Sequence, residues 1–425
     1  MYDVIGVGIG PFNLSLAALL DDIPEIEALF FDKTSEFVWH PGMLIGGTDL
    51  QVPFIADLVT FANPQSKYTF LNYLHHHNRL YQFFFFNRFD IPRREYNDYA
   101  AWVASMLKSC HFGHEVIDVK EAENSHYVVT VSDHEGNQKE YKAKHVVIGT
   151  GNIPLVPIEL VQTNRDDVFH SSEYLYKKEG VKEAKSITVI GSGQSAAEIF
   201  LDLLQVQKDY HYEITWFTRS AEFLQLESAK LGQEVFSPDY VEYFHKLPFK
   251  ERMDALPQLG QLRKGIDPNT LKSIYDQLYH RSVSVEEQPV YIQPLTEVSR
   301  IEKAEDEYKL SCEQWQAKKD FDHYSEKVIL ATGYKPNIPS WLTQYKDKLV
   351  WEDEKRFKVD NDYKLVFKDD QVHNLYTLTN IEHSHGAGAT NLGLSVYRNT
   401  KIINSILGKQ HFKEMKNTVF QQFSP

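Results

Sequence analysis

Two glycine-rich segments, far apart in the chain, have the residue types and spacing that nucleotide phosphates require. Glycine lets the backbone turn tightly and approach a pyrophosphate, whose charge is met by free amides at the start of a helix. The chemistry that this predicts is the binding of two dinucleotides. The residues that carry it are Gly8, Gly10, Pro11 and Asn13 in the first segment, and Gly191, Gly193, Gln194 and Ser195 in the second.

The elements needed to position the first segment are present. Residues 3–7 are apolar and predict a strand, residues 14–20 have a helical pattern, and residues 28–31 predict the next strand. That strand ends at Asp32, where an acidic residue binds a ribose hydroxyl in such units. The sequence therefore predicts a complete strand–helix–strand nucleotide unit.

The second segment has the same arrangement, with strands predicted at residues 186–190 and 214–217. Arg219 follows the second of these strands, where an acid would otherwise stand. An arginine there can pair with a 2′-phosphate, which favours NADPH over NADH. The alternative is an ordinary surface arginine.

The order of these units predicts an α/β fold with two Rossmann-like domains, the second inserted in the first. Strand-and-turn segments at residues 146–151 and 328–334 run into proline-rich loops that we expect to be hinges. A polar helical pattern follows at 237–279, and a terminal helix is expected at 395–407. We expect an FAD domain at 1–160 and 325–425, an NADPH domain at 161–236 and 280–324, and a small helical substrate subdomain at 237–279.

Composition narrows the function further. The chain has 425 residues and a net charge of −14, which argues against nucleic acid or an anionic membrane as a partner. No apolar run approaches a membrane span, and the aromatic run at 83–86 is expected in the core or in a pocket wall. Only two cysteines occur, Cys110 and Cys312, so electron chemistry must come from a bound cofactor. We expect a cytoplasmic protein, because the first residues enter a strand at once.

Several short motifs in a fixed order resemble the flavin-dependent N-hydroxylating monooxygenases of siderophore biosynthesis, which act on lysine, ornithine or small diamines. The match extends over nearly the whole chain. The motifs occupy residues 8–13, 39–43, 50–51, 57–60, 72–74, 94–99, 331–334, 383–386 and 391–394.

This resemblance implies FAD and NADPH as cofactors and a sequence of steps. NADPH reduces the flavin, oxygen adds at flavin C4a, and the substrate amine attacks the resulting hydroperoxide, which is shielded from water. Gln51 is implied to lie beside the flavin and to orient it and the hydroperoxide; the alternative is a polar core residue. Further cofactor contacts are expected from Trp39, His40, Met43, Thr332, Gly333, His385, Asn391 and Leu392.

At the positions that are expected to contact the substrate, the sequence differs from the ornithine enzymes. They place a lysine at the position of Ala56 and an asparagine at that of Gln233, both serving the amino-acid end of the substrate. Leu394 is expected beside them. An alanine cannot hold a carboxylate, so the hypothesis is a decarboxylated amine, putrescine or cadaverine first, with lysine and then histamine as alternatives.

Other classes of function remain open from the sequence. A different flavin monooxygenase and a non-enzymatic NADPH-binding sensor are both compatible with two nucleotide units. A metal site is not expected, because the histidines at 75–77 and at 383 and 385 lack accompanying carboxylate spacing. We expect a homo-oligomer, dimer or tetramer, with a small amine and O2 as its reaction partners.

Overall fold

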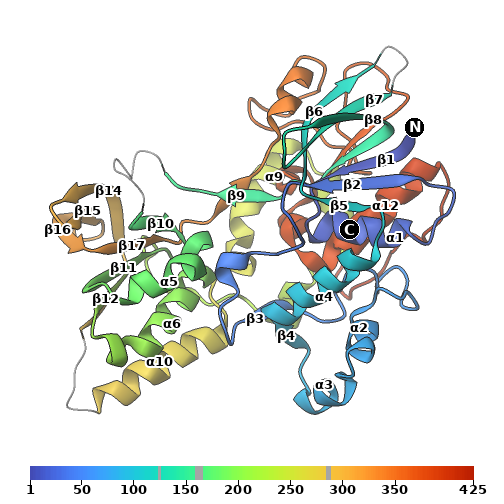
Figure 1. Cartoon of the computed structure of the whole chain (residues 1–425). Coiled ribbons are helices and arrows are strands. Elements are labelled where there is room, and N and C mark those ends of the chain that lie inside the picture. The colour runs from blue at the N-terminus through green and yellow to red at the C-terminus, as the bar shows by residue number, and fades with distance from the viewer. Residues whose placement is uncertain (123–125, 158–165, 284–288) are drawn as a thin grey trace.

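The computed structural model describes residues 1–122, 126–157, 166–283 and 289–425. The expected boundary between residues 160 and 161 lies outside these ranges. The described residues form two lobes, each built on its own sheet, which Figure 1 shows on opposite sides of the molecule. No helix in these ranges is long and apolar enough to cross a membrane.

The first lobe contains a seven-stranded sheet in the order β5-β2-β1-β8-β7-β6, with β19 also paired to β8. Strands β1, β2, β5, β8 and β19 run parallel, whereas β6 and β7 add an antiparallel edge. The bounds are β1 (Tyr2–Val7), β2 (Ala28–Asp32), β5 (Cys110–Phe112), β6 (His114–Glu121), β7 (Tyr127–Asp133), β8 (Gln138–Ile148) and β19 (Leu375–Thr377).

The second lobe contains five parallel strands in the order β10-β17-β11-β12-β13, with a separate three-stranded antiparallel sheet beside them. The bounds are β10 (Val168–His170), β11 (Ser186–Ile190), β12 (Glu213–Phe217), β13 (Val290–Gln293), β17 (Lys327–Leu330), and β14 (Thr296–Ala304), β15 (Glu307–Gln314) and β16 (Lys319–Ser325). The second lobe is inserted between β8 and β19 of the first. The expected α/β fold with one unit inserted in the other is confirmed.

Helices cover both sheets, and each lobe has its own apolar core. They are α1 (Pro11–Leu20), α2 (Phe70–His76), α3 (Leu80–Phe86), α4 (Arg93–Met106), α5 (Tyr174–Lys182), α6 (Gln194–Tyr210), α7 (Lys230–Gln233), α8 (Pro238–Lys246), α9 (Phe249–Ala255), α10 (Pro268–Ser282), α11 (Glu382–His385) and α12 (Ser395–Leu407). Short 3-10 turns are η1 (Pro41–Met43), η2 (Ser171–Glu173), η3 (Leu256–Leu262), η4 (Ser340–Tyr345), η5 (Ala387–Thr390) and η6 (Leu392–Leu394).

The predicted helical segment at 237–279 is helical, but its helices divide between the lobes. Helix α8 contacts α11 of the first lobe, whereas α10 packs along α6 of the second. Ile274 of α10 is buried in the core of the second lobe, which explains this placement.

The two proline-rich connections lie side by side between the lobes. Strand β9 (Asn152–Pro154) pairs antiparallel with β18 (Tyr334–Pro336), so both crossings form one ribbon. Figure 1 shows β9 running from one lobe to the other. A second ribbon, β3 (Asp49–Pro53) with β4 (Asp90–Pro92), faces the second lobe and carries Gln51.

Candidate active site

Both glycine turns stand at the carboxyl end of a central parallel strand, where such sheets bind nucleotides. Gly8 has a φ of +86°, and a Cβ there would lie 2.7 Å from the carbonyl oxygen of Gly149. Gly191 has the same relationship to the carbonyl of Ala331. Each turn is thus pressed against the end of the neighbouring strand, and only glycine fits.

The helices that follow the turns begin without a side-chain cap. Helix α1 starts after Gly10 with Pro11 in its first turn, and α6 starts after Gly193. A Cβ on Gly10 or Gly193 would meet no atom within 4 Å, so space is open before each helix. Uncapped amides facing open space suit a pyrophosphate, and both sites therefore fit a dinucleotide.

Asp32 and Arg219 are the residues expected near the riboses of the two nucleotides. Asp32 is the last residue of β2, and Arg219 comes after β12. The Asp32 carboxylate accepts hydrogen bonds from the Ile9 amide at 2.7 Å and from the Thr34 amide at 2.9 Å. Asp32 thereby fixes the glycine turn, and its expected contact with a ribose stays a prediction. Arg219 follows β12, and its side chain is 76% exposed, with Nη1 3.5 Å from Glu297 Oε1.

Asn13 lies behind the first turn and not at its open face. Its side chain is fully buried, and Nδ2 donates to the carbonyl of Gly8 at 2.8 Å. Asn13 also fills the space that a side chain on Gly149 would need. The structure therefore places Asn13 as a support of the turn, and its expected contact with a nucleotide stays a prediction.

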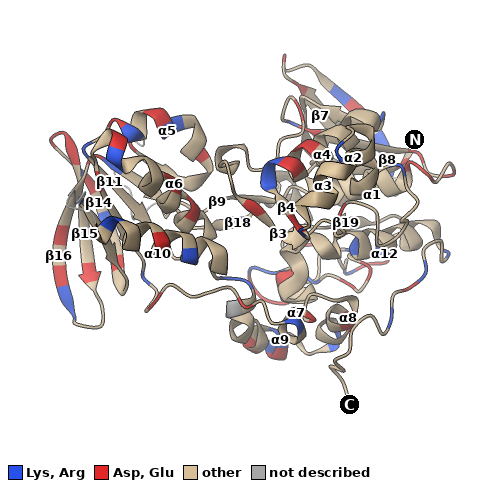
Figure 2. Ribbon diagram, turned by 90° about the horizontal axis from the view of Figure 1, so that it is seen from below, with Lys and Arg blue, Asp and Glu red and all other residues tan. Residues whose placement is uncertain are grey.

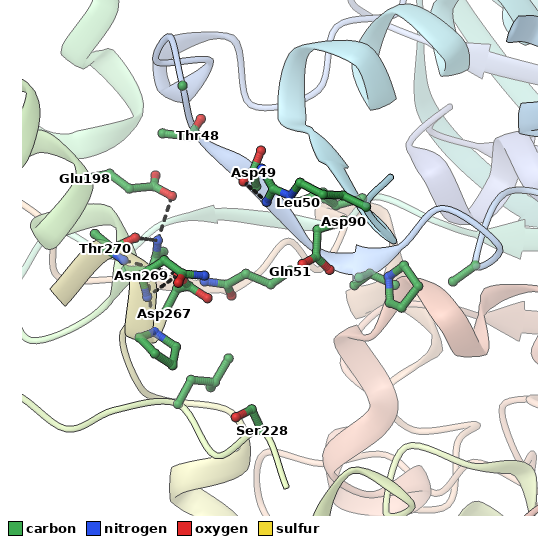
Figure 3. Close-up of a pocket in the computed structure, with 18 of the residues that line it drawn as sticks. Thr48, Asp49, Leu50, Gln51, Asp90, Glu198, Ser228, Asp267, Asn269 and Thr270 are labelled. Carbon is green, nitrogen blue, oxygen red and sulfur yellow. Dashed lines mark hydrogen bonds and ion pairs between the residues drawn. The ribbon is translucent and has the colours of Figure 1, made fainter. Parts of the chain in front are cut away.

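Two adjoining cavities, of about 460 and 960 Å3, open between the lobes. Figure 3 shows the larger one, with Asp49, Gln51 and Asp90 on one side and Glu198, Asp267 and Thr270 on the other. Nine of the residues expected at the cofactors or the substrate meet at the smaller cavity. They are Trp39, His40, Met43, Gln51, Gln194, Ser195, Gln233, Asn391 and Leu392.

The larger cavity has no cation at Ala56, the position that the sequence singled out for contact with the substrate. Ala56 is buried, and a Cβ built on Gly393 would lie 3.5 Å from the Ala56 Cβ, so two small residues face each other. Gln233 lines the same cavity, and its amide donates to the backbone carbonyl of Glu227. Phe236 completes this part of the wall.

Gln194 is held by protein groups. Its Nε2 donates to Glu198 Oε1 at 2.9 Å and to Thr270 Oγ1 at 3.1 Å, while its Oε1 accepts from the Asp267 amide at 2.8 Å. The side chain joins α6 to the start of α10. Gln194 therefore shapes the cavity wall, and its expected contact with a cofactor stays a prediction.

His385 and Leu394, both expected at the site, lie in the core and line neither cavity. His385 is 1% exposed, with its ring stacked on Tyr363 at 4.0 Å and its Nδ1 2.9 Å from Ser384 Oγ. Burial lowers the pKa of His385 far below the usual histidine value, so the ring is neutral. Leu394 is buried with Val241 and Tyr397. Its neighbour Gly393 lines the cavity instead.

The run at 83–86 was expected in the core or in a pocket wall, and this is confirmed only for Phe83. Phe84, Phe85 and Phe89 are exposed, because only Phe83 of the run at 83–86 turns into the core. Tyr240 and Phe244 are buried among apolar side chains of α8 and α9. The aromatic rings that line the cavities are instead Trp39, Phe61, Phe236 and Tyr334.

Some residues take their role from contacts between the lobes, and the sequence did not predict that role. Arg93 lines the smaller cavity and forms a two-bond ion pair with Glu198 across the lobes. The Tyr334 ring contacts His40 at 5.6 Å between ring centres. Desolvation and the Arg93 charge lower the pKa of His40 to about 4. No local pattern marks partners that lie 105 residues apart.

Thr332 and Gly333 lie on the connection between the lobes. Thr332 Oγ1 donates to the Leu155 carbonyl at 2.5 Å, and the Gly333 carbonyl accepts from the Leu155 amide at 2.9 Å. Both residues therefore fasten the β9–β18 ribbon beside the cavities.

Comparison with known proteins shows which family has this fold and these site residues. The family model for L-lysine 6-monooxygenase/L-ornithine 5-monooxygenase matches residues 1–336. The chain belongs to this family. A putrescine N-hydroxylase of Shewanella oneidensis is 38% identical over 430 residues, covering 100% of this chain and 84% of that protein.

Two solved structures of N-hydroxylating relatives share the whole architecture. A cadaverine monooxygenase of the desferrioxamine pathway of Erwinia amylovora, bound to FAD, is 34% identical, with a TM-score of 0.95 and coverage of 100% and 99%. An ornithine N-hydroxylase of Kutzneria, with reduced FAD, NADP+ and L-ornithine, is 28% identical, with a TM-score of 0.90 and coverage of 96% and 99%. The expected family, flavin monooxygenase class, and FAD and NADPH cofactors are confirmed.

Proposed function

We propose that this monooxygenase hydroxylates one nitrogen of an aliphatic diamine, putrescine or cadaverine, in the assembly of a hydroxamate siderophore. The observation that carries the proposal is the pair Ala56 and Gly393, which leaves no cation where an amino-acid carboxylate would need one. Relatives that act on putrescine and on cadaverine support it. L-lysine and histamine are the alternative substrates.

The charge of the larger cavity also favours a diamine. Asp90 and Glu227 line it, and neither carboxylate forms an ion pair among the interactions of the described residues. Two basic residues, Arg88 and Lys230, line the same cavity, and Arg88 is paired with Asp49. A diamine carries a second ammonium, which these carboxylates attract. In L-lysine, the α-carboxylate would offset that attraction.

We assign the cofactors to the two glycine turns, FAD at Gly8 and Gly10, and NADPH at Gly191 and Gly193. Bound FAD, reduced by NADPH, supplies the activated oxygen that is transferred to the amine. The chain itself positions the reactants. We assign Gln51 the role of orienting the groups at the cavity, because its β3 strand is the wall that both cavities share.

The reacting amine must be unprotonated, and its ordinary pKa is ~10.4. We propose that removal of water does this, because a desolvated pocket disfavours the charged form. Phe236, Val52 and Leu226 line both cavities and supply apolar wall. His40, whose pKa is lowered, stays neutral and adds no cation near the reacting nitrogen.

The test is a coupled assay of NADPH oxidation and hydroxylamine formation with putrescine, cadaverine, histamine, L-lysine and L-ornithine. We expect the highest kcat/KM with a diamine. A clear preference for lysine or ornithine would overturn the diamine assignment while leaving the monooxygenase class intact. Cytoplasmic location and assembly into a homo-oligomer stay predictions.

A further inference from the structure

Arg398 is a buried arginine near the start of α12, close to the candidate site. It is 1% exposed, and within the described residues its guanidinium has no carboxylate partner. Burial lowers the pKa of Arg398 to about 10, so the side chain stays protonated at neutral pH. Charged side chains are almost never fully buried unless they are paired. An unpaired buried cation is therefore a feature that needs a function.

The guanidinium holds one segment of the cavity wall. Its Nη1 donates to the carbonyl of Ala389 at 2.8 Å. Its Nη2 donates to the carbonyls of Gly388 and Asn391 at 3.2 and 2.9 Å, and its Nε donates to that of Leu394 at 3.2 Å. All of these acceptors lie in the segment that runs through η5 and η6. One side chain thus fixes the shape of this segment.

The same segment contributes to both cavities. Thr390, Asn391 and Leu392 line the smaller cavity, and Asn391 and Gly393 line the larger one. The Asn391 side chain also accepts a hydrogen bond from the Gly393 amide at 2.7 Å. The position of this wall therefore depends on Arg398, although Arg398 itself lines neither cavity.

On its other side, the guanidinium lies over the start of α1. Its central carbon is 4.4 Å from the centre of the Phe12 ring, a cation–π contact. Phe12 stands in the first turn of α1, two residues after Gly10, and its carbonyl accepts from Asn399 Nδ2 at 2.9 Å. Figure 1 and Figure 2 show α12 beside α1 in the first lobe. The charge thus lies between the first glycine turn and the cavity wall.

The groups around Arg398 do not balance its charge. Two polar rings interact with it, those of Tyr363 and His385. Burial raises the pKa of Tyr363 and lowers the pKa of His385, so both rings are neutral at pH 7. The carbonyl oxygens supply only partial negative charge. Among the described residues, Arg398 therefore has no full counter-charge.

We propose that Arg398 is a positioning residue whose positive charge is balanced by bound FAD. FAD carries negative phosphates, and its reduction by hydride from NADPH adds two electrons and one proton, which leaves the flavin ring with additional negative charge. A cation that is shielded from water interacts strongly with such charges. The proposal rests on the assignment of FAD to the turn at Gly8 and Gly10 and does not depend on which amine is the substrate.

Two variants of the full-length protein separate the charge from the hydrogen bonds. Arg398→Met removes both, whereas Arg398→Lys keeps the charge but has fewer donors, in a different geometry. The Kd for FAD is measured by fluorescence titration and the midpoint potential of bound FAD by redox titration. In Arg398→Met we expect a Kd about tenfold higher or more and a more negative potential. In Arg398→Lys both quantities should stay close to those of the wild type.

The two measurements also locate the counter-charge. A higher Kd at an unchanged potential would place it at the phosphates, and a more negative potential would place it at the ring. Lys401→Met is the matched control, because Lys401 lies on the same helix and is paired with Glu242. We expect this control to change neither quantity, and circular dichroism checks that each variant is folded.

A folded Arg398→Met variant with the wild-type Kd and potential would overturn the proposal. Equal losses in Arg398→Lys and Arg398→Met would also overturn it, because hydrogen bonds alone would then explain them. If Arg398→Met does not fold, Arg398→Lys decides, since a loss there contradicts a role of the charge.

The assignment of FAD to the first turn is tested separately by Gly8→Ala, whose Cβ would lie 2.7 Å from the Gly149 carbonyl oxygen. We expect this variant to lose FAD binding. Wild-type affinity there would overturn the assignment and the proposal with it.

Discussion

The guanidinium of Arg93 and the carboxylate of Glu198 form two hydrogen bonds, of 2.8 and 2.7 Å, that join helix α4 of the first lobe to α6 of the second. The two side chains are 14% and 3% exposed. Arg93 also donates to the Met43 carbonyl at 3.0 Å. The pair therefore fixes the lobes where the two cavities meet.

Replacing Glu198 with Gln should leave the Arg93 charge buried and unpaired. Breaking a buried ion pair costs about 3 kcal/mol or more. We expect a melting temperature several degrees lower and a reduced kcat/KM for NADPH, measured by calorimetry and steady-state kinetics. Lys272→Gln, which breaks the exposed Lys272–Asp276 pair, is the control and should change stability by less than about 1 kcal/mol. Equal effects of both variants would show that the link between the lobes has no special role.

Replacing Arg219 with Ala should lower the selectivity for NADPH over NADH. A charged hydrogen bond to a 2′-phosphate contributes about 1.5–3 kcal/mol, so kcat/KM for NADPH should fall about tenfold or more. NADH lacks that phosphate and serves as the internal control. A parallel loss with both nucleotides would exclude the assigned role.

Replacing Ala56 with Lys should place an ammonium opposite Gly393 and repel a diamine. At a distance of ~4 Å near a protein surface, like charges interact by up to about 4 kcal/mol, so KM for the diamine should rise at least tenfold. Ala56→Met has a similar length without charge and separates repulsion from crowding. The proposal predicts a larger effect for Lys than for Met, and equal losses would contradict it.

Replacing Gln51 with Ala should uncouple NADPH oxidation from hydroxylation. Loss of one positioned hydrogen-bonding group at a reacting centre typically costs about tenfold to a hundredfold in rate. We expect less hydroxylamine and more hydrogen peroxide per NADPH, at unchanged FAD content. The exposed Gln258→Ala variant is the control. Unchanged coupling in Gln51→Ala would remove Gln51 from the reaction.

His145 should make the protein less stable in mild acid. Burial and the nearby His373 lower its pKa from 6.5 to about 4, so the unfolded chain binds the proton more readily than the folded one. The stabilisation is complete above pH 6.5 and is lost as the pH falls toward 4. His145 should account for about 2 kcal/mol of the difference between pH 7 and pH 5 in urea unfolding.

The variant His145→Gln should reduce this pH dependence, because Gln cannot bind a proton. Its side-chain oxygen can accept the hydrogen bond that His145 Nδ1 receives from the Asn374 amide. The exposed His134→Gln variant is the comparison. The same pH dependence in His145→Gln and the wild type would show that other groups cause the acid sensitivity.

The sequence by itself determined the elements of local origin. Both glycine turns, the strands before them, the helices after them and the terminal helix 395–407 follow from spacing within a few residues, because apolar periodicity and glycine geometry act locally. Ala56 was also visible in the sequence, because its small size differs from the lysine of ornithine enzymes.

Only the tertiary structure decided which of these residues share a cavity. It placed Gly393 opposite Ala56, moved His385 and Leu394 into the core, and exposed Phe84 and Phe85. The run at 83–86 is uniformly aromatic, so composition alone could not tell which ring faces inward. Packing of Phe83 against Phe54 and Phe70 made that choice, because one side of a short helix can reach a core that the other side cannot.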